Sequence, residues 1–274
     1  ARGGGLGGSI AILNHAGLRL KNSTAMGNVA EGKGSLGGFL YARLSAPILF
    51  QNTRIEKCTA AAGAGALAIV ASSSIALDAV EIARCSAGGI GGGAILVDEG
   101  SEAHLIGRCR LEENHAEMEG AGGHVHVAAS KFIVHGQQSF LEWPALRPVF
   151  PNTVLLPNSK FGEDEVKETR DYTTFSRGDA RKGFGGSIFC TASLSSPILR
   201  TFEGARSQQS SCDSKLYKFK SDYRSFRQIP SQFVCFGKGV YLGSGSLIEK
   251  SQASEGGGAI FGSGCSIHLD SSLL

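Results

Sequence analysis

The chain has few prolines and almost no net charge, and its many glycines follow no regular triplet period. Proline occurs 7 times among 274 residues against 39 glycines, and the glycines follow no Gly-X-Y period, which excludes a collagen triple helix. The net charge of +3 gives no reason to expect nucleic acid or anionic lipid as a partner. Hydrophobic residues still make up 42% of the chain, enough to bury a core, so the chain is expected to fold.

The chain also lacks the cysteine spacing and the apolar segments that mark other classes. Its 7 cysteines include no Cys-x-x-Cys pair, so no zinc or redox motif is present, and the disulfide pairing stays open. An uncharged run over 60–77 consists mostly of Ala, Gly and Ser, so no transmembrane helix is expected there. No motif indicates a cofactor. The chain begins at Ala1 without a methionine and ends at Leu274 just after a glycine-rich motif, which indicates a segment of a longer protein.

A double glycine followed by small or apolar residues recurs along the chain and defines an internal repeat. Successive second glycines are first separated by 30, 27, 28 and 30 residues, counting a degenerate copy at Gly65. The second glycines of the intact copies are Gly8, Gly38, Gly93, Gly123, Gly186 and Gly258. A second landmark, an apolar residue followed three positions later by Asn, Cys or Ser, has the same period. Its polar members are Asn28, Cys58, Cys85, Asn114 and Ser251.

The spacing within each repeat favours strands. Apolar residues alternate with period two after the glycines, as in Ile95 and Val97, and no sustained 3.6-residue pattern indicates a helical repeat. A second strand is predicted at Leu18/Leu20, Ile48/Phe50, Ile75/Leu77 and His104/Ile106. Strands that recur once per period with the same inward face stack as parallel sheets. The sequence therefore predicts an all-β, right-handed, single-stranded parallel β-helix of about seven or eight coils, forming one domain over 1–274.

Stacked coils place equivalent residues above one another. The five polar landmark residues are therefore expected to form an inward ladder, in which Cys58 and Cys85 are two buried thiols and not a disulfide. The glycine pairs are expected to supply backbone angles that other residues avoid at a corner. Open end coils need cover, which we expect from flanking sequence or another subunit.

The repeat resembles the glycine-rich repeats of chlamydial polymorphic outer membrane proteins, which pair a GGA[ILV] box with an FxxN box. Gly92-Gly93-Ala94-Ile95 and Gly257-Gly258-Ala259-Ile260 match the first box, and Leu111-Glu112-Glu113-Asn114 matches the second with leucine in place of phenylalanine. The resemblance covers about residues 3–136 well, and 183–202 and 237–270 in patches. It implies a pectin-lyase-like β-helical passenger segment with an adhesin-like role, located at the cell surface, in the outer membrane or outside the cell.

Two stretches lose the repeat and are predicted to be long loop insertions, at about 137–182 and 203–236. The first contains Arg177-Gly178-Asp179, the tripeptide that integrin ligands display on exposed loops. The second interleaves cations with aromatic residues, a composition suited to polyanions, although such a segment also fits a hairpin packed on the helix. Its candidate binding residues are Lys215, Tyr217, Lys218, Lys220, Arg224 and Arg227.

Histidines and carboxylates supply the remaining candidate chemistry. His124 and His126 are predicted to point outward from one strand face, where a third ligand would complete a weak metal site, whereas His104 is predicted to be a core residue. Glu56 and Glu112 share one repeat position and belong to an alternating charge ladder, so no dense carboxylate cluster indicates catalysis.

Three functions remain open after these observations. The first is a non-catalytic surface or extracellular scaffold that presents loops to a protein or glycan partner. The second is a polysaccharide lyase or glycoside hydrolase that acts in an outer groove, as many β-helical proteins do. The third is a polyanion-binding module centred on 215–227.

Overall fold

The computed structural model describes residues 6–117, 122–135, 173–192, 238–243 and 245–269, and within them the chain forms strands and turns only. Each strand pairs in parallel with the strand four positions further along the chain, so four separate sheets result. None of the described residues form a helix that could cross a membrane. The second insertion, 203–236, lies outside the described residues.

Two of the four sheets have seven strands each. The first sheet contains β1 (Ile10–Leu13), β5 (Leu40–Arg43), β9 (Leu67–Val70), β13 (Ile95–Val97), β17 (Val125–Ala128), β21 (Ile188–Thr191) and β25 (Ile260–Ser263). The second sheet contains β2 (Leu18–Lys21), β6 (Ile48–Gln51), β10 (Ser74–Asp78), β14 (Glu102–Ile106), β18 (Lys131–Val134), β22 (Gly239–Leu242) and β26 (Ser266–Leu269).

The other two sheets have six strands each and contain the shorter strands. The third sheet contains β3 (Thr24–Met26), β7 (Arg54–Glu56), β11 (Glu81–Ala83), β15 (Arg110–Glu112), β19 (Thr174–Ser176) and β23 (Leu247–Glu249). The fourth sheet contains β4 (Val29–Ala30), β8 (Thr59–Ala60), β12 (Ser86–Ala87), β16 (His115–Ala116), β20 (Asp179–Ala180) and β24 (Gln252–Ala253).

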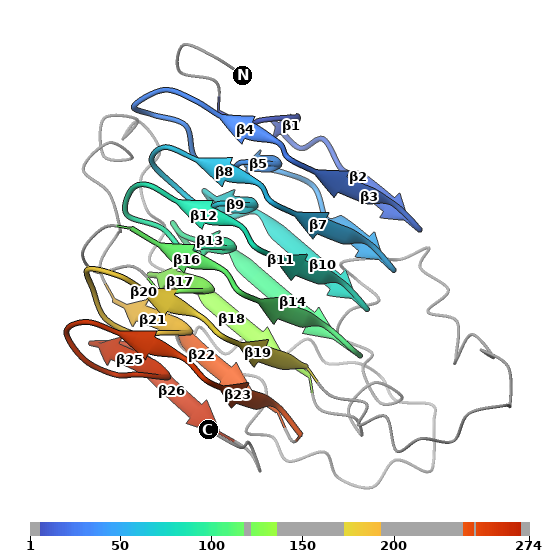
Figure 1. Ribbon diagram of the computed structural model, residues 1–274. Coiled ribbons are helices and arrows are strands. Elements are labelled where there is room, and N and C mark those ends of the chain that lie inside the picture. The colour runs from blue at the N-terminus through green and yellow to red at the C-terminus, as the bar shows by residue number, and fades with distance from the viewer. Residues whose placement is uncertain (1–5, 118–121, 136–172, 193–237, 244, 270–274) are drawn as a thin grey trace, which may run out of the picture.

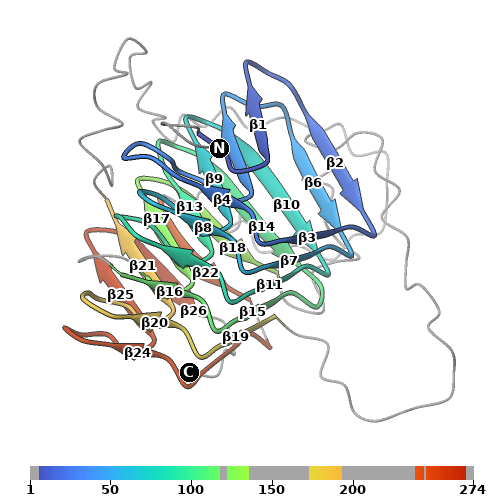
Figure 2. The ribbon, with the colours of Figure 1, turned by 45° about the horizontal axis from the view of Figure 1, so that its top comes forward.

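We call one passage through the four sheets a rung. Rungs follow one another from the N-terminal to the C-terminal end of a single stack, as Figure 1 shows, and the tilted view in Figure 2 shows the sheets facing one another around it. This all-parallel arrangement is compatible with the predicted β-helix.

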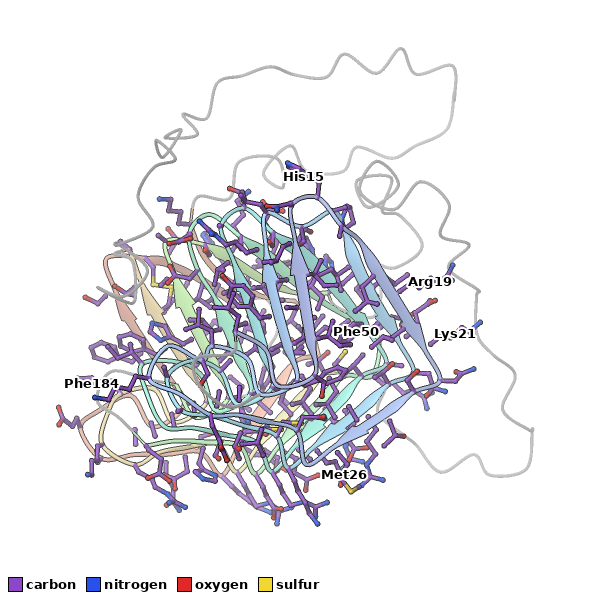
Figure 3. The ribbon with its side chains drawn as sticks, turned by 90° about the horizontal axis from the view of Figure 1, so that it is seen from above. His15, Arg19, Lys21, Met26, Phe50 and Phe184 are labelled. Carbon is purple, nitrogen blue, oxygen red and sulfur yellow. A yellow bond between two sulfur atoms is a disulfide. The ribbon has the colours of Figure 1, made fainter. Side chains whose placement is uncertain are left out.

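The predicted inward file of the first sheet is confirmed. Its register aligns Ile10, Leu40, Leu67, Ile95, Val125, Ile188 and Ile260. These side chains meet those of the second and third sheets in one continuous apolar core, which includes Phe50, Phe132 and Phe175. Figure 3 shows Phe50 inside the stack, while Arg19, Lys21 and Met26 project from its outside. Burial of these files is the main source of stability because apolar area leaves water at every rung.

The predicted position of His104 is wrong by one residue. Ala103 and Leu105 pair with Ile75 and Leu77, so His104 faces the outside of the second sheet. The prediction assumes the same distance from the second strand to the polar landmark residue in every rung. The turn between β14 and β15 is one residue longer than in earlier rungs, so the strand before Asn114 is displaced by one residue. His104 is nevertheless nearly buried, with its Nδ1 3.1 Å from Nε2 of His135.

The polar ladder is present and links rungs through thiols and amides. The Asn28 amide donates to Cys58 Sγ (3.6 Å), the Cys58 backbone N–H donates to Cys85 Sγ (3.4 Å), and the Cys85 N–H donates to Asn114 Oδ1 (2.9 Å). Cys58 and Cys85 are buried free thiols, as predicted. Ser251 holds the same place two rungs after Asn114, because its neighbour Gln252 pairs with Asp179.

The predicted conformational role of the glycine pairs is confirmed at the first glycine of two copies, and the second glycines show a different reason for glycine. Left-handed backbone angles occur at the first glycine in two copies, Gly185 (φ 66°) and Gly257 (φ 63°), but at none of the second glycines. A Cβ at Gly93 would instead lie 2.5 Å from the backbone nitrogen of His115 and would also overlap the Gly123 carbonyl oxygen. Second glycines such as Gly93 are therefore needed where the first-sheet turn and the fourth-sheet strand of one rung touch through their backbones, whereas Gly258 has no such contact.

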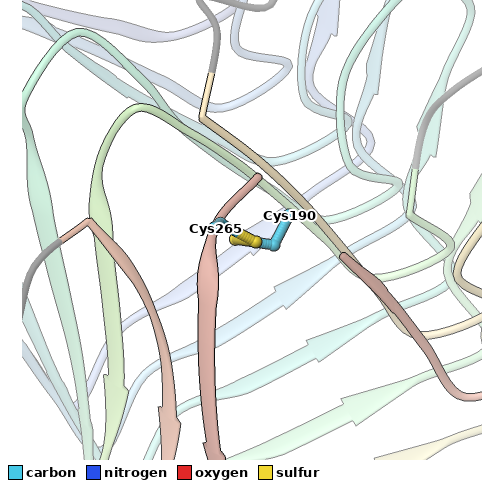
Figure 4. The surroundings of a disulfide bond; sticks show 2 residues. All are labelled: Cys190 and Cys265. Carbon is cyan, nitrogen blue, oxygen red and sulfur yellow. A yellow bond between two sulfur atoms is a disulfide. The ribbon is translucent and has the colours of Figure 1, made fainter. Parts of the chain in front are cut away.

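One disulfide joins the last two rungs. Cys190 in β21 and Cys265, between β25 and β26, are bonded with their Cα atoms 6.2 Å apart (Figure 4). The remaining described cysteine, Cys109, is a buried free thiol. At the end of the stack, Ile267 and Leu269 continue inward files but are 37% and 46% exposed.

Candidate binding groove on the third sheet

The third sheet presents three outward files of side chains in regular register. In each of its strands the middle residue points into the core, as Ile55, Ile82 and Phe175 do, while the first and third residues face out. The residue after each strand is left-handed and also faces out. This turn file comprises Gly27, Lys57, Arg84, Glu113, Arg177 and Lys250, with φ between 53° and 65°.

Ion pairs run between neighbouring rungs on this face, as the predicted charge ladder requires. Glu56, with a side chain only 3% exposed, accepts from Arg84 at 3.0 Å and also pairs with Arg54. Desolvation alone would raise the pKa of Glu56, but hydrogen bonds and charge from Arg84 and Arg54 outweigh it and lower the pKa. Arg177 pairs with Glu112 and, at 2.6 Å, with Glu113.

A hollow of about 240 Å³ opens on this face across β15, β19 and β23. It forms because β19 presents two short hydroxyl side chains, Thr174 and Ser176, where the neighbouring strands present longer ones. We call it the groove. Its charged lining residues are Arg110, Glu112, Arg177, Glu249 and Lys250.

The two walls of the groove differ in their ion pairing. On the β15 side, Glu112 lies against the Arg177 guanidinium and 3.9 Å from that of Arg110. On the β23 side, neither Glu249 nor Lys250 has an ion pair within the part of the chain that the structure describes. Among the described residues, the groove therefore offers one carboxylate and one ammonium group that a ligand can engage without breaking an ion pair.

Of the Arg177-Gly178-Asp179 tripeptide, Arg177 alone lines the groove. The tripeptide lies where β19 ends and β20 begins and not in an inserted loop, so the prediction that places it there is wrong and the predicted first insertion extends too far toward the C-terminus. Gly178 holds the polar-ladder place between Asn114 and Ser251. Arg177 is tied to two glutamates, and Asp179 lies in the fourth sheet. The tripeptide is therefore not presented as a free loop motif.

The two histidines predicted to share an outward face are buried on opposite sides of the chain. His124 lies in the bend before β17 and points inward, with Nδ1 3.0 Å from Asn114 Nδ2, whereas His126 faces out and contacts the ring of Phe189 edge-on. Burial lowers the pKa of each to about 3. Because the bend turns His124 inward, the pair cannot ligate one ion together. Within the described residues, no group of three or more His, Cys, Asp or Glu side chains could hold a metal.

Gly178 explains how His124 can enter the core. A Cβ at Gly178 would lie 2.7 Å from Cδ2 and 2.8 Å from Nε2 of the His124 ring. The imidazole thus fills the space that a ladder side chain takes in other rungs. A sequence signal for this rung exists, because Phe175-x-x-Gly178-x-Ala180 follows the spacing of the second landmark with glycine in the polar place.

The candidate residues Lys215, Lys218, Lys220, Arg224 and Arg227, with Tyr217, lie outside the described residues, so their role stays a prediction. Comparisons of the chain with family models, curated proteins and solved structures gave no match. The likeness to the outer membrane repeat family therefore depends on the sequence boxes alone.

Proposed function

We propose that this chain is a right-handed parallel β-helix of the pectin-lyase-like type. We propose further that it is a non-catalytic scaffold, located at the cell surface, in the outer membrane or outside the cell, that binds a glycan or protein partner. The observation that carries the proposal is the unbroken register of four parallel sheets through successive rungs. Such a stack is stiff because every rung is hydrogen-bonded to the next, and it holds outward side chains at a fixed spacing of about 4.8 Å.

The resemblance to chlamydial polymorphic outer membrane proteins supports an adhesin-like role. Ile95 and Ile260, the last residues of the two matching boxes, stand in the same inward file of the first sheet. A box that recurs in one structural place is what a passenger-like repeat requires, since each copy must make the same turn. The proposal is therefore supported by the recurring sequence box, by its constant place in the sheet register and by the polar outer face of the stack.

A second candidate function is a polysaccharide lyase or glycoside hydrolase. The observation in its favour is that three cations and two carboxylates line the groove. Glu112 and Glu249 are two rungs apart, or roughly 10 Å at the usual strand spacing. The carboxyl groups of inverting glycosidases are separated by about 6.5–9.5 Å, so the two glutamates lie near that range.

A glycan array run beside a reducing-end release assay on the purified chain separates the two functions. The scaffold proposal predicts binding to a glycan without release of new reducing ends. Release that survives repurification and disappears in both Glu112→Gln and Glu249→Gln would establish the enzyme instead. Release that persists in both variants would point to a contaminating activity.

A further inference from the structure

We propose that the groove on the third sheet is a binding site for an acidic oligosaccharide, one that bears carboxylate or sulfate groups beside free hydroxyls. The inference rests on the proposed binding function, but it places the ligand on a rigid sheet face and not on the inserted loops.

The groove surface has the polarity of a sugar-binding site. Its floor is made of the Thr174 and Ser176 hydroxyls, which both donate and accept hydrogen bonds. Its walls supply the Glu249 carboxylate, an acceptor for sugar hydroxyls, and cationic donors from Arg110 and Lys250. A chain of hydroxyl groups can satisfy such a lining at every position, because each hydroxyl is donor and acceptor at once.

The same surface is a poor site for a peptide. The central strand β19 is paired on both sides, with β15 and β23, so its backbone offers no edge for strand addition. The lining also holds no apolar pocket for an anchoring side chain. Leu111 is its one aliphatic member, and the Leu111 side chain is buried in the core. A ligand must therefore be recognised through hydroxyl groups and charge.

The charge balance selects an acidic ligand. Three cations and two carboxylates line the groove, but Arg177 is neutralised by Glu112 and Glu113. Lys250, which follows Arg177 in the turn file, has no ion pair among the residues that the structure describes. An anionic ligand group beside Lys250 gains a favourable charge interaction that a neutral sugar lacks.

Calorimetric titration with an oligogalacturonate hexamer at about 150 mM salt tests the site, beside maltohexaose as the neutral probe and a heparin-derived hexasaccharide as the sulfated one. Lys250→Asn removes the cation and suits the left-handed backbone, and Ser176→Leu fills the floor. Each is expected to weaken binding of an acidic hexamer about tenfold. Lys57→Asn, a lysine in the same turn file with nearly the same φ (53° against 54°) but outside the groove, is expected to change it less than twofold.

The outcomes separate the groove from the wider proposal. Equal losses of affinity in Lys57→Asn and Lys250→Asn would mean that the whole face attracts the ligand diffusely. Unchanged affinity in both groove variants would place the ligand elsewhere. Either result would refute the groove as the binding site. Binding to neither acidic hexamer also overturns it, while a hit on the glycan array or a protein ligand would leave the scaffold standing. Cleavage of a bound hexamer would keep the groove and refute the non-catalytic scaffold. Circular dichroism melts of all variants establish that each is folded.

Discussion

Replacing Gly93 by alanine tests whether the second glycines are fixed by backbone contact. The added methyl group would lie 2.5 Å from the His115 nitrogen and 2.7 Å from its carbonyl carbon, and it would overlap the Gly123 oxygen. Ordinary contacts to a Cβ begin near 3.4 Å, so two backbones must separate by about 1 Å. His115 belongs to the paired strand β16, and the Gly93 N–H in the turn before β13 donates to the Gly122 carbonyl oxygen of the next rung, so movement of either backbone breaks hydrogen bonds.

The expected cost of Gly93→Ala is about 2 kcal/mol of unfolding free energy. Overpacking of a rigid site costs up to roughly 3 kcal/mol, while the loss of glycine entropy in the unfolded chain returns about 0.4–1 kcal/mol. In a chain of this size, ~2 kcal/mol lowers the melting temperature by roughly 4–8 °C. Thermal denaturation followed by far-ultraviolet circular dichroism, with urea titration as a second measure, gives both quantities.

Gly258→Ala is the matched control. Gly258 is also the second glycine of its pair, but a Cβ there would meet nothing closer than the Ser251 oxygen at 3.8 Å. Its φ is not left-handed, so alanine should leave stability unchanged or raise it by up to about 1 kcal/mol. Equal melting temperatures for Gly93→Ala and Gly258→Ala would refute the contact explanation and return the glycines to a conformational role.

Two further predictions concern pH and the disulfide. His124 and His126 are neutral when folded because their pKa values fall to about 3, so the unfolded chain binds more protons below its ordinary pKa of about 6.5. The free energy of unfolding should therefore fall by about 2 kcal/mol per histidine when the pH is lowered from above about 6.5 to 5. A urea midpoint that does not move between pH 7 and 5 would contradict the burial of His124 and His126. Reducing Cys190–Cys265, which spans 75 residues, should cost about 4 kcal/mol by the loop-entropy relation; calorimetry with and without reductant measures it, and Cys109→Ala should leave the reductant effect intact.

The inward files could be predicted from the sequence because their signal is local and repeated. Ile95 and Val97 alternate with period two, and the same spacing recurs at Leu40 and Leu67, so register follows once the glycine period is known. The predicted side-chain orientations are wrong where the local geometry of one rung differs from that of its neighbours. An extra turn residue moved His104 outward, and a bend turned His124 inward.

The groove could not be predicted because it depends on contrasts in size between residues far apart in the chain. Ser176 makes a floor only because Glu112 and Glu249 stand beside it, and an interval of more than 60 residues separates each of these glutamates from that serine. The second landmark recurs at Phe175-x-x-Gly178-x-Ala180, but glycine in the polar place and the preceding stretch without a repeat hide it. The signal therefore gives the register of this rung only when glycine is allowed in the polar place, and it does not give the contrast in side-chain size that makes the groove.

In the left-handed turn file, the backbone conformation is constant while the charge of the side chain varies from rung to rung. At Lys57, Arg84 and Glu113 the backbone takes nearly one φ, although the side chains differ in charge and length. Substitutions there among residues that tolerate this φ change the charge pattern on the outer face of the third sheet while the inward files stay the same. Surface charge can therefore vary in this file by point substitution without a change in the residues that form the core.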